Sequence, residues 1–217
     1  GVLTSRSQRM ILGEFVAALE AEWTHFFQAH WRGKAAQVGE LQSFLTESWR
    51  GEYGPALMPF LAGEGMSGGV IALVPAIGVD GRIFGGSPQN PGDNVLMVSA
   101  PRDLERGPDA VYSALREMSF PMVRRVMERT GVVAGNRNEE ERLASRAAIR
   151  SGALILERYH SDELVDYQRF FLSQAGRSAP AGEAIEVAFR EAYPLVASFE
   201  EALREEIFST ERDGGVG

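Results

Sequence analysis

The segment from Gly107 to Gly131, GPDAVYSALREMSFPMVRRVMERTG, predicts one long buried helix. Its apolar residues recur at spacings of three and four, which is the period of one face of an α-helix. Pro108 and Asp109 suit a first helical turn, and Gly131 suits the left-handed residue that ends a helix. We therefore expect a central helix over residues 109–130 with its stripe in the core. The stripe consists of Val111, Leu115, Met118, Met122 and Val126.

The other side of this helix carries polar and aromatic residues. Residues three or four apart share a helix face, whereas residues two apart nearly oppose each other. We expect this mixed face to be turned away from the apolar stripe. Its members are Ser113, Arg116, Glu117, Phe120 and Arg124.

The segment Arg116-Glu117-Met118-Ser119-Phe120 resembles the H-E-x-x-H motif of zincin metallopeptidases, in the gluzincin-like form of secreted bacterial domains. In that family two histidines at i and i+4 hold zinc, and the glutamate is the general base. Only the glutamate matches here. The order of elements is also similar, since glycine-rich apolar strands precede the helix and more helices follow it. The likeness in architecture covers roughly residues 50–175.

The departures from the motif remove the zinc chemistry. Arginine is a permanent cation without a lone pair to offer, and phenylalanine has no donor atom. Arg116 and Phe120 therefore cannot hold zinc, and Glu117 lacks the ion whose bound water it would activate. We expect an Arg116–Glu117 pair in a cleft, with no metal and no other cofactor. The alternative is that both are solvated helix residues and that Phe120 packs under a loop.

Composition limits the partners. The 217 residues carry a net charge of −8, which disfavours nucleic acid and anionic lipid as partners. No run approaches the roughly 20 apolar residues of a membrane span. The absence of cysteine excludes disulfides and a thiolate nucleophile. The chain begins with Gly1 rather than Met and shows no leader, so the sequence itself does not indicate a location. The resemblance to secreted bacterial domains implies an extracytoplasmic location, periplasmic or secreted.

We expect a single domain over residues 1–217 that opens with a helical hairpin over residues 5–50. Its helices would cover residues 5–31 and 34–50, with Gly33 ending the first. His25 and His30 lie five apart and are rotated by about 140° on that helix, so they cannot chelate a metal together. The apolar stripes are Ile11, Phe15, Leu19, Trp23 and Phe26 or Phe27 in the first helix, and Val38, Leu41, Leu45 and Trp49 in the second.

Residues 51–100 are rich in glycine and proline, which predicts strands and loops. Apolar runs at residues 69–74, 82–84 and 94–99 predict a small sheet of about three or four strands, residues 69–99, beside the central helix. Val79-Asp80-Gly81-Arg82 suits a tight hairpin turn. The glycines near residue 65 lack the rest of a phosphate-binding loop, so nucleotide binding is disfavoured.

Residues 138–208 predict a C-terminal helical part. Asn138 with Glu141 resembles a capping box that starts a helix running to Tyr159. In gluzincins the third zinc ligand is a glutamate on such a downstream helix, and no single position here matches it. The resemblance also makes Tyr159 and His160, at the next junction, candidate remnants of an oxyanion-stabilising pair.

The sequence thus predicts a helix-dominant α+β fold of zincin-like type. The function it implies is that of a pseudoenzyme, an inactive metallopeptidase homologue. Such a domain would bind a peptide, a protein or a small ligand in the former substrate cleft, or serve structurally. The alternative is an active metal-dependent, peptidase-like hydrolase with an unusual ligand set around Glu117, such as Glu117 with His160 and a downstream glutamate. The candidate remnant residues are Glu117, Arg116, Phe120, Tyr159 and His160.

Overall fold

The computed structural model describes residues 6–66, 68–75, 77, 81–86, 92–132, 135–182 and 184–209. The chain divides into two compact units, residues 1–43 and residues 44–217, and each is described by itself. The described residues are mostly helical and form one three-stranded sheet, which confirms the helix-dominant α+β fold. None of the described helices combines the length and the apolar character needed to cross a lipid bilayer.

The first unit is helical throughout its described residues. It contains α1 (Arg6–Glu22), the π-helical segment η1 (Trp23–Phe27) and most of α2 (Gln28–Ser48), which continues into the second unit. The turn expected at Gly33 is wrong, because Gly33 lies inside α2; one interior glycine costs a helix only about 1 kcal/mol. The apolar stripe of the first helix is not core either, since Ile11 is 62% exposed.

The second unit begins with the end of α2 and the π-helical segment η2 (Trp49–Tyr53). Glycine at position 131 has φ 64° and ends the central helix, as predicted. The N-cap residue of the next helix lies two positions earlier than expected. Asn136, not Asn138, accepts a hydrogen bond from the backbone N–H of Glu139. The helices that follow η2 are α3 (Gly54–Gly63), α4 (Gly107–Thr130), α5 (Arg137–Tyr159), η3 (Ser161–Glu163), α6 (Leu164–Gln174), α7 (Ala184–Ala192) and α8 (Ala197–Ser209).

The sheet contains β1 (Gly69–Leu73), β2 (Arg82–Phe84) and β3 (Asn94–Val98) in the order β1-β3-β2. β3 is parallel to β1 and antiparallel to β2. The hairpin turn expected at residues 79–82 falls largely outside the described residues. The strands on either side of it do not pair with each other, because β3 lies between them.

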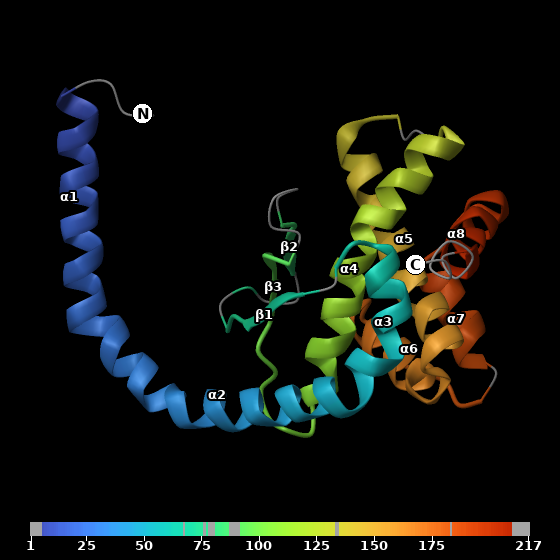
Figure 1. Ribbon diagram of the computed structural model, residues 1–217, viewed down its shortest axis with the longest axis horizontal. Coiled ribbons are helices and arrows are strands. Elements are labelled where there is room, and N and C mark those ends of the chain that lie inside the picture. Colours follow the sequence, from blue (N-terminus) through green and yellow to red (C-terminus); the bar gives the residue numbers. More distant parts are fainter. Residues whose placement is uncertain are drawn as a thin grey trace. The chain divides into compact units, whose positions relative to one another are not determined.

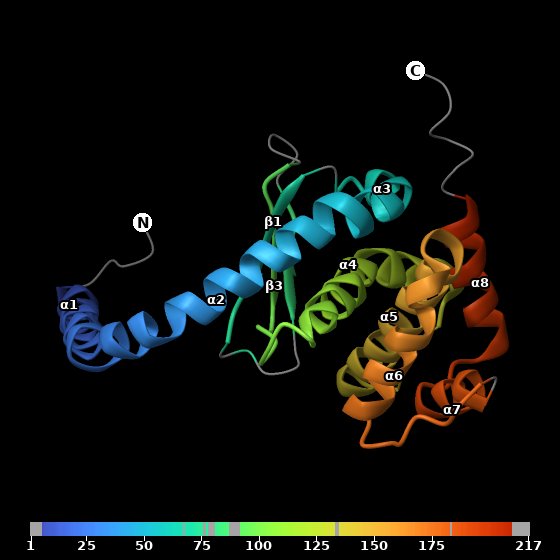
Figure 2. The same ribbon diagram turned by 90° about the horizontal axis from the view of Figure 1, so that it is seen from below.

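Helix α4 is the centre of the second unit, as Figures 1 and 2 show: the sheet lies on one side of it and helices α5 and α8 lie on the other. All five residues of the predicted apolar stripe are buried. The cross-strand row of Ile71, Leu96 and Ile83 shares one face of the sheet and packs against this core. The adjacent row of Val70, Val95 and Phe84 faces the opposite way and is exposed.

Candidate functional site

Glu117 and Arg116 form the expected pair, with 3.4 Å between Glu117 Oε1 and Arg116 Nη1. The pair lies in the interior rather than in an open cleft, since Glu117 is only 4% exposed. Gly81, the residue before β2, lies against the side chain of Glu117. A Cβ added at Gly81 would lie 2.5 Å from Glu117 Cγ, so this close approach requires glycine.

The guanidinium of Arg116 reaches α5. It donates a hydrogen bond to Ser145 Oγ over 3.1 Å, and its Cζ lies 5.5 Å from the centre of the Phe120 ring. An arginine and a phenylalanine offer zinc no lone pair, so these residues do not fit a zinc ion. Three of the downstream glutamates are engaged elsewhere: Glu139 accepts from Gly135 N, Glu141 pairs with Arg137, and Glu157 pairs with Arg204.

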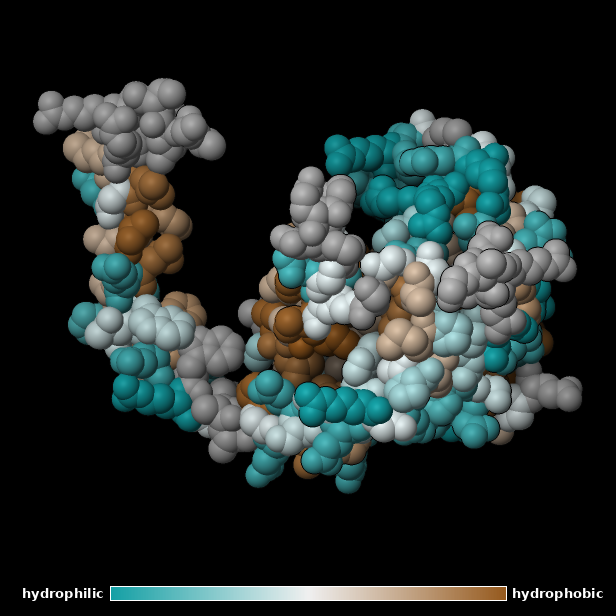
Figure 3. Space-filling view, viewed as in Figure 1, coloured by the Kyte–Doolittle hydropathy of each residue, from teal (hydrophilic) through white to brown (hydrophobic). Residues whose placement is uncertain are grey.

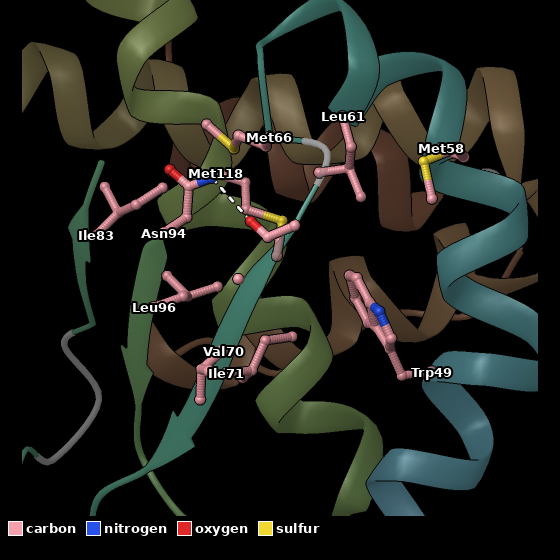
Figure 4. A pocket seen from close by; sticks show the side chains of 12 residues that line it. Trp49, Met58, Leu61, Met66, Val70, Ile71, Ile83, Asn94, Leu96 and Met118 are labelled. Atoms are coloured by element: carbon pink, nitrogen blue, oxygen red, sulfur yellow. Dashed lines mark hydrogen bonds between the residues drawn. The ribbon is translucent and has the colours of Figure 1, made fainter. Parts of the chain in front are cut away.

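An apolar cavity of about 170 Å³ lies beside strand β1. In Figure 4, Trp49 and Met58 lie on the helical side of β1, whereas Ile83 and Leu96 lie on its sheet side. Asn94 Nδ2 donates to the carbonyl of Gly68 over 2.8 Å and ties β3 to the residue before β1. The side chains around the cavity are Trp49, Met58, Leu61, Met66, Val70, Ile71, Ile83, Asn94, Leu96 and Met118.

The surface next to this cavity is also apolar. Figure 3 shows hydrophobic residues gathered over the strands of the sheet. Val70 is 62% exposed and Met58 is 47% exposed, and both also line the cavity. The cavity therefore belongs to a wider hydrophobic surface around β1.

A second group of polar side chains meets where α5 ends and η2 passes. His160 Nε2 lies 3.2 Å from Glu52 Oε1, and one ligand atom from each of Glu52, His160 and Glu163 lies within 4.8 Å of the others. Tyr53 and Tyr112 both donate their hydroxyl hydrogen to Glu163 Oε2, over 2.8 Å and 2.5 Å. The Tyr53 ring also makes an edge contact with the imidazole, with 5.3 Å between the ring centres.

The two tyrosines of this group remain protonated. Burial raises the pKa of Tyr53 and of Tyr112 well above the usual range, and hydrogen bonding to Glu163 raises both further. They therefore act as hydrogen-bond donors that orient the carboxylate of Glu163. An imidazole and two carboxylates so close together are a set that could hold a divalent metal ion.

The structure separates the other predicted pair. The hydroxyl of Tyr159 reaches the carbonyl of Ile207 on α8, at 3.5 Å, whereas His160 contacts Glu52 and Tyr53. Sequence reasoning missed Glu52, Tyr53, Tyr112 and Glu163. Tyr53 is 110 positions from Glu163, and no local motif spans such a distance. The one available signal was the crowding of ionisable side chains on either side of the junction at His160.

Comparison of this chain with protein-family models, with curated proteins and with solved structures finds no match.

Proposed function

We propose that residues 44–217 form a non-catalytic, zincin-like binding domain that takes up an extended polypeptide segment beside strand β1. The observation that supports this most is the apolar cavity next to an edge strand. The resemblance of the α4 segment to the zincin motif motivates the idea of a former substrate cleft, and it also motivates an extracytoplasmic location.

The free edge of β1 favours a polypeptide over other ligands. β1 pairs with β3 and with no other strand among the described residues. Val74 N donates to Val98 O over 2.8 Å, so alternation along the strand turns the backbone groups of Ile71 and Leu73 to the open edge. A peptide that adds as a strand would satisfy these N–H and C=O groups.

The cavity side chains set the kind of peptide. Met58, Met66 and Met118 are flexible and polarisable, so they adapt to hydrophobic side chains of different shape. Trp49 adds a large flat apolar surface. We therefore expect an extended segment with alternate hydrophobic residues, held by its backbone at β1 and by its side chains in the cavity.

We propose a non-catalytic domain because the side chains of Arg116, Glu117 and Phe120 cannot form a zinc-dependent active site. Arg116 and Phe120 offer no lone pair to zinc, and the carboxylate of Glu117 is enclosed by Arg116 and by the backbone of Gly81. A buried, ion-paired glutamate has no access to a substrate carbonyl or a water molecule.

Peptide binding to the 217-residue chain tests the proposal. A displayed library of 12-residue peptides is selected on the protein, and an enriched peptide is synthesised with a fluorophore for anisotropy titration. Met58→Glu should weaken binding at least tenfold, because it places a charge at the cavity. Val187→Glu is the matched control, since Val187 is 59% exposed on α7 and does not line the cavity. N-methylation of alternate peptide amides should abolish binding if the peptide adds as a strand.

Two results would reject this function. One is a selected peptide whose affinity is the same for Met58→Glu and for Val187→Glu. The other is a peptide that tolerates N-methylation at every backbone amide.

The alternative function is metal-dependent hydrolysis at Glu117. In that case the protein would cleave fluorescent casein in a chelator-sensitive reaction, and Glu117→Gln would abolish that cleavage.

A further inference from the structure

We propose that Glu52, His160 and Glu163 bind one divalent transition-metal ion, at a site distinct from the zincin-like motif on α4. The three residues come from η2, from the junction after α5, and from η3. Each contributes one ligand atom, and the ion would sit between them.

The separation between His160 and Glu52 suits two neighbouring ligands of one ion. Nitrogen and oxygen ligands about 2.1 Å from a metal lie about 3.0–3.4 Å apart at neighbouring coordination positions. His160 Nε2 and Glu52 Oε1 are 3.2 Å apart. His160 Nε2 is buried and lacks a hydrogen-bond partner among the described residues, so the approach to Glu52 is close without being a hydrogen bond. A cation is the partner that both atoms can share.

The surroundings of Glu163 match those of a metal ligand. Ligating carboxylates are themselves held by hydrogen bonds from a second layer of residues. Both tyrosine hydroxyls go to Oε2 of Glu163, so Oε1 is the oxygen that can turn to an ion. Because Tyr112 lies on α4 and Tyr53 on η2, two separate elements fix this carboxylate.

The backbone conformation of η2 is an independent indication. Single π-helical turns inside helices are uncommon and occur often at functional sites. Residues Trp49–Tyr53 form such a turn. It supplies Glu52 to the cluster and Tyr53 to the hydrogen bond that holds Glu163. The Glu52 side chain is 54% exposed, so the ion has a route from solvent and a side open to water.

The ligand set selects the class of metal. Imidazole suits zinc, copper, iron and nickel, whereas magnesium, calcium and manganese prefer oxygen ligands. One nitrogen and two carboxylates leave a coordination position for water, as in open zinc sites. We therefore expect Zn²⁺ to bind more tightly than Mn²⁺, and Mg²⁺ to bind weakly.

Calorimetric titration of the chelator-stripped 217-residue chain with Zn²⁺ tests the site. We expect one ion per chain and a loss of more than a hundredfold in affinity for Glu52→Gln and for His160→Gln. Tyr112→Phe should lower the affinity about ten- to a hundredfold, because it removes one orienting hydrogen bond. Co²⁺ should give the visible absorption of a low-coordinate site in the wild type and lose it in Glu52→Gln.

Matched controls separate this site from surface binding. His25→Gln removes an exposed histidine of the first unit, and Glu157→Gln removes an exposed glutamate of α5; both should leave Zn²⁺ binding unchanged. Circular dichroism of the metal-free variants establishes that each is folded, and Glu52→Gln changes an exposed side chain if His160→Gln fails to fold. The proposal is wrong if no single Zn²⁺ binds, if binding survives Glu52→Gln, or if His25→Gln weakens it equally.

Discussion

At the scale of single residues, the charge of Glu117 has to be balanced inside the protein. Its carboxylate lies 3.4 Å from the guanidinium of Arg116, and both side chains are mostly buried. Breaking such a pair by removing one charge leaves the other uncompensated, which costs about 3–5 kcal/mol. Glu117→Gln should therefore lower the free energy of unfolding by about 3 kcal/mol in urea titrations.

A surface glutamate provides the control for this effect. Glu157 pairs with Arg204 over 3.1 Å, but both side chains are more than a third exposed. Glu157→Gln should cost less than about 1 kcal/mol, because water screens exposed ion pairs. If both substitutions had the same small effect, the Arg116–Glu117 pair would not be buried in solution.

The same residues show what sequence can and cannot provide. That Arg116 and Phe120 cannot bind zinc follows from their side-chain chemistry alone. That Glu117 is enclosed depends on Gly81, which lies 36 positions earlier and meets it only once the sheet has packed on α4. The group around His160 has the same origin, since Glu52 and Glu163 are neighbours only in the folded chain.

At the scale of elements, periodicity succeeded where a helix is enclosed and failed where one is not. The core helix predicted from the stripe of α4 was correct, because the sheet and α5 cover this helix on opposite sides (Figure 2). The stripe of α1 has the same spacing, yet Phe15 is 59% exposed. Spacing shows which residues share a face, but it cannot show whether another element covers that face.

Gly33 allows a direct test of the uninterrupted helix α2. An added Cβ would meet nothing within 4 Å, and its φ is not positive. Gly33→Ala should therefore stabilise α2 by about 0.5–1 kcal/mol and slow amide hydrogen exchange in residues 28–38. If Gly33 instead ended a helix in the left-handed conformation, alanine would be strained and exchange would be faster.

Gly152→Ala should have the opposite effect, since it lies where α5 meets α6. Its Cβ would collide with the hydroxyl oxygen of Tyr167, which donates to the carbonyl of Ile149 over 2.9 Å. We expect a loss of about 1–3 kcal/mol from overpacking, measured by urea unfolding. A neutral result would mean that α5 and α6 are farther apart than described.

At the scale of the whole second unit, one carboxylate joins three helices. Glu200 on α8 forms ion pairs with Arg190 on α7, at 2.7 Å, and with Arg150 on α5. Burial raises the pKa of Glu200, but the two arginines outweigh burial and bring it below the ordinary value of 4.5. The charged form is therefore favoured by folding.

The pH dependence of stability follows from that direction. Because the folded-state pKa is lowered, the contribution of Glu200 is fully present above pH 4.5 and is lost as the pH falls through the lowered pKa. Other acids titrate in the same range; burial raises the pKa of Asp109, for example, which gives the opposite slope. Comparing the wild type with Glu200→Gln at each pH cancels the contributions of these other acids to stability. The stability difference between the two proteins, from urea unfolding at a series of pH values, should be constant near neutrality and shrink below pH 4.5. A difference that stays constant down to the acid unfolding limit would show that the three helices are not joined through the charge of Glu200.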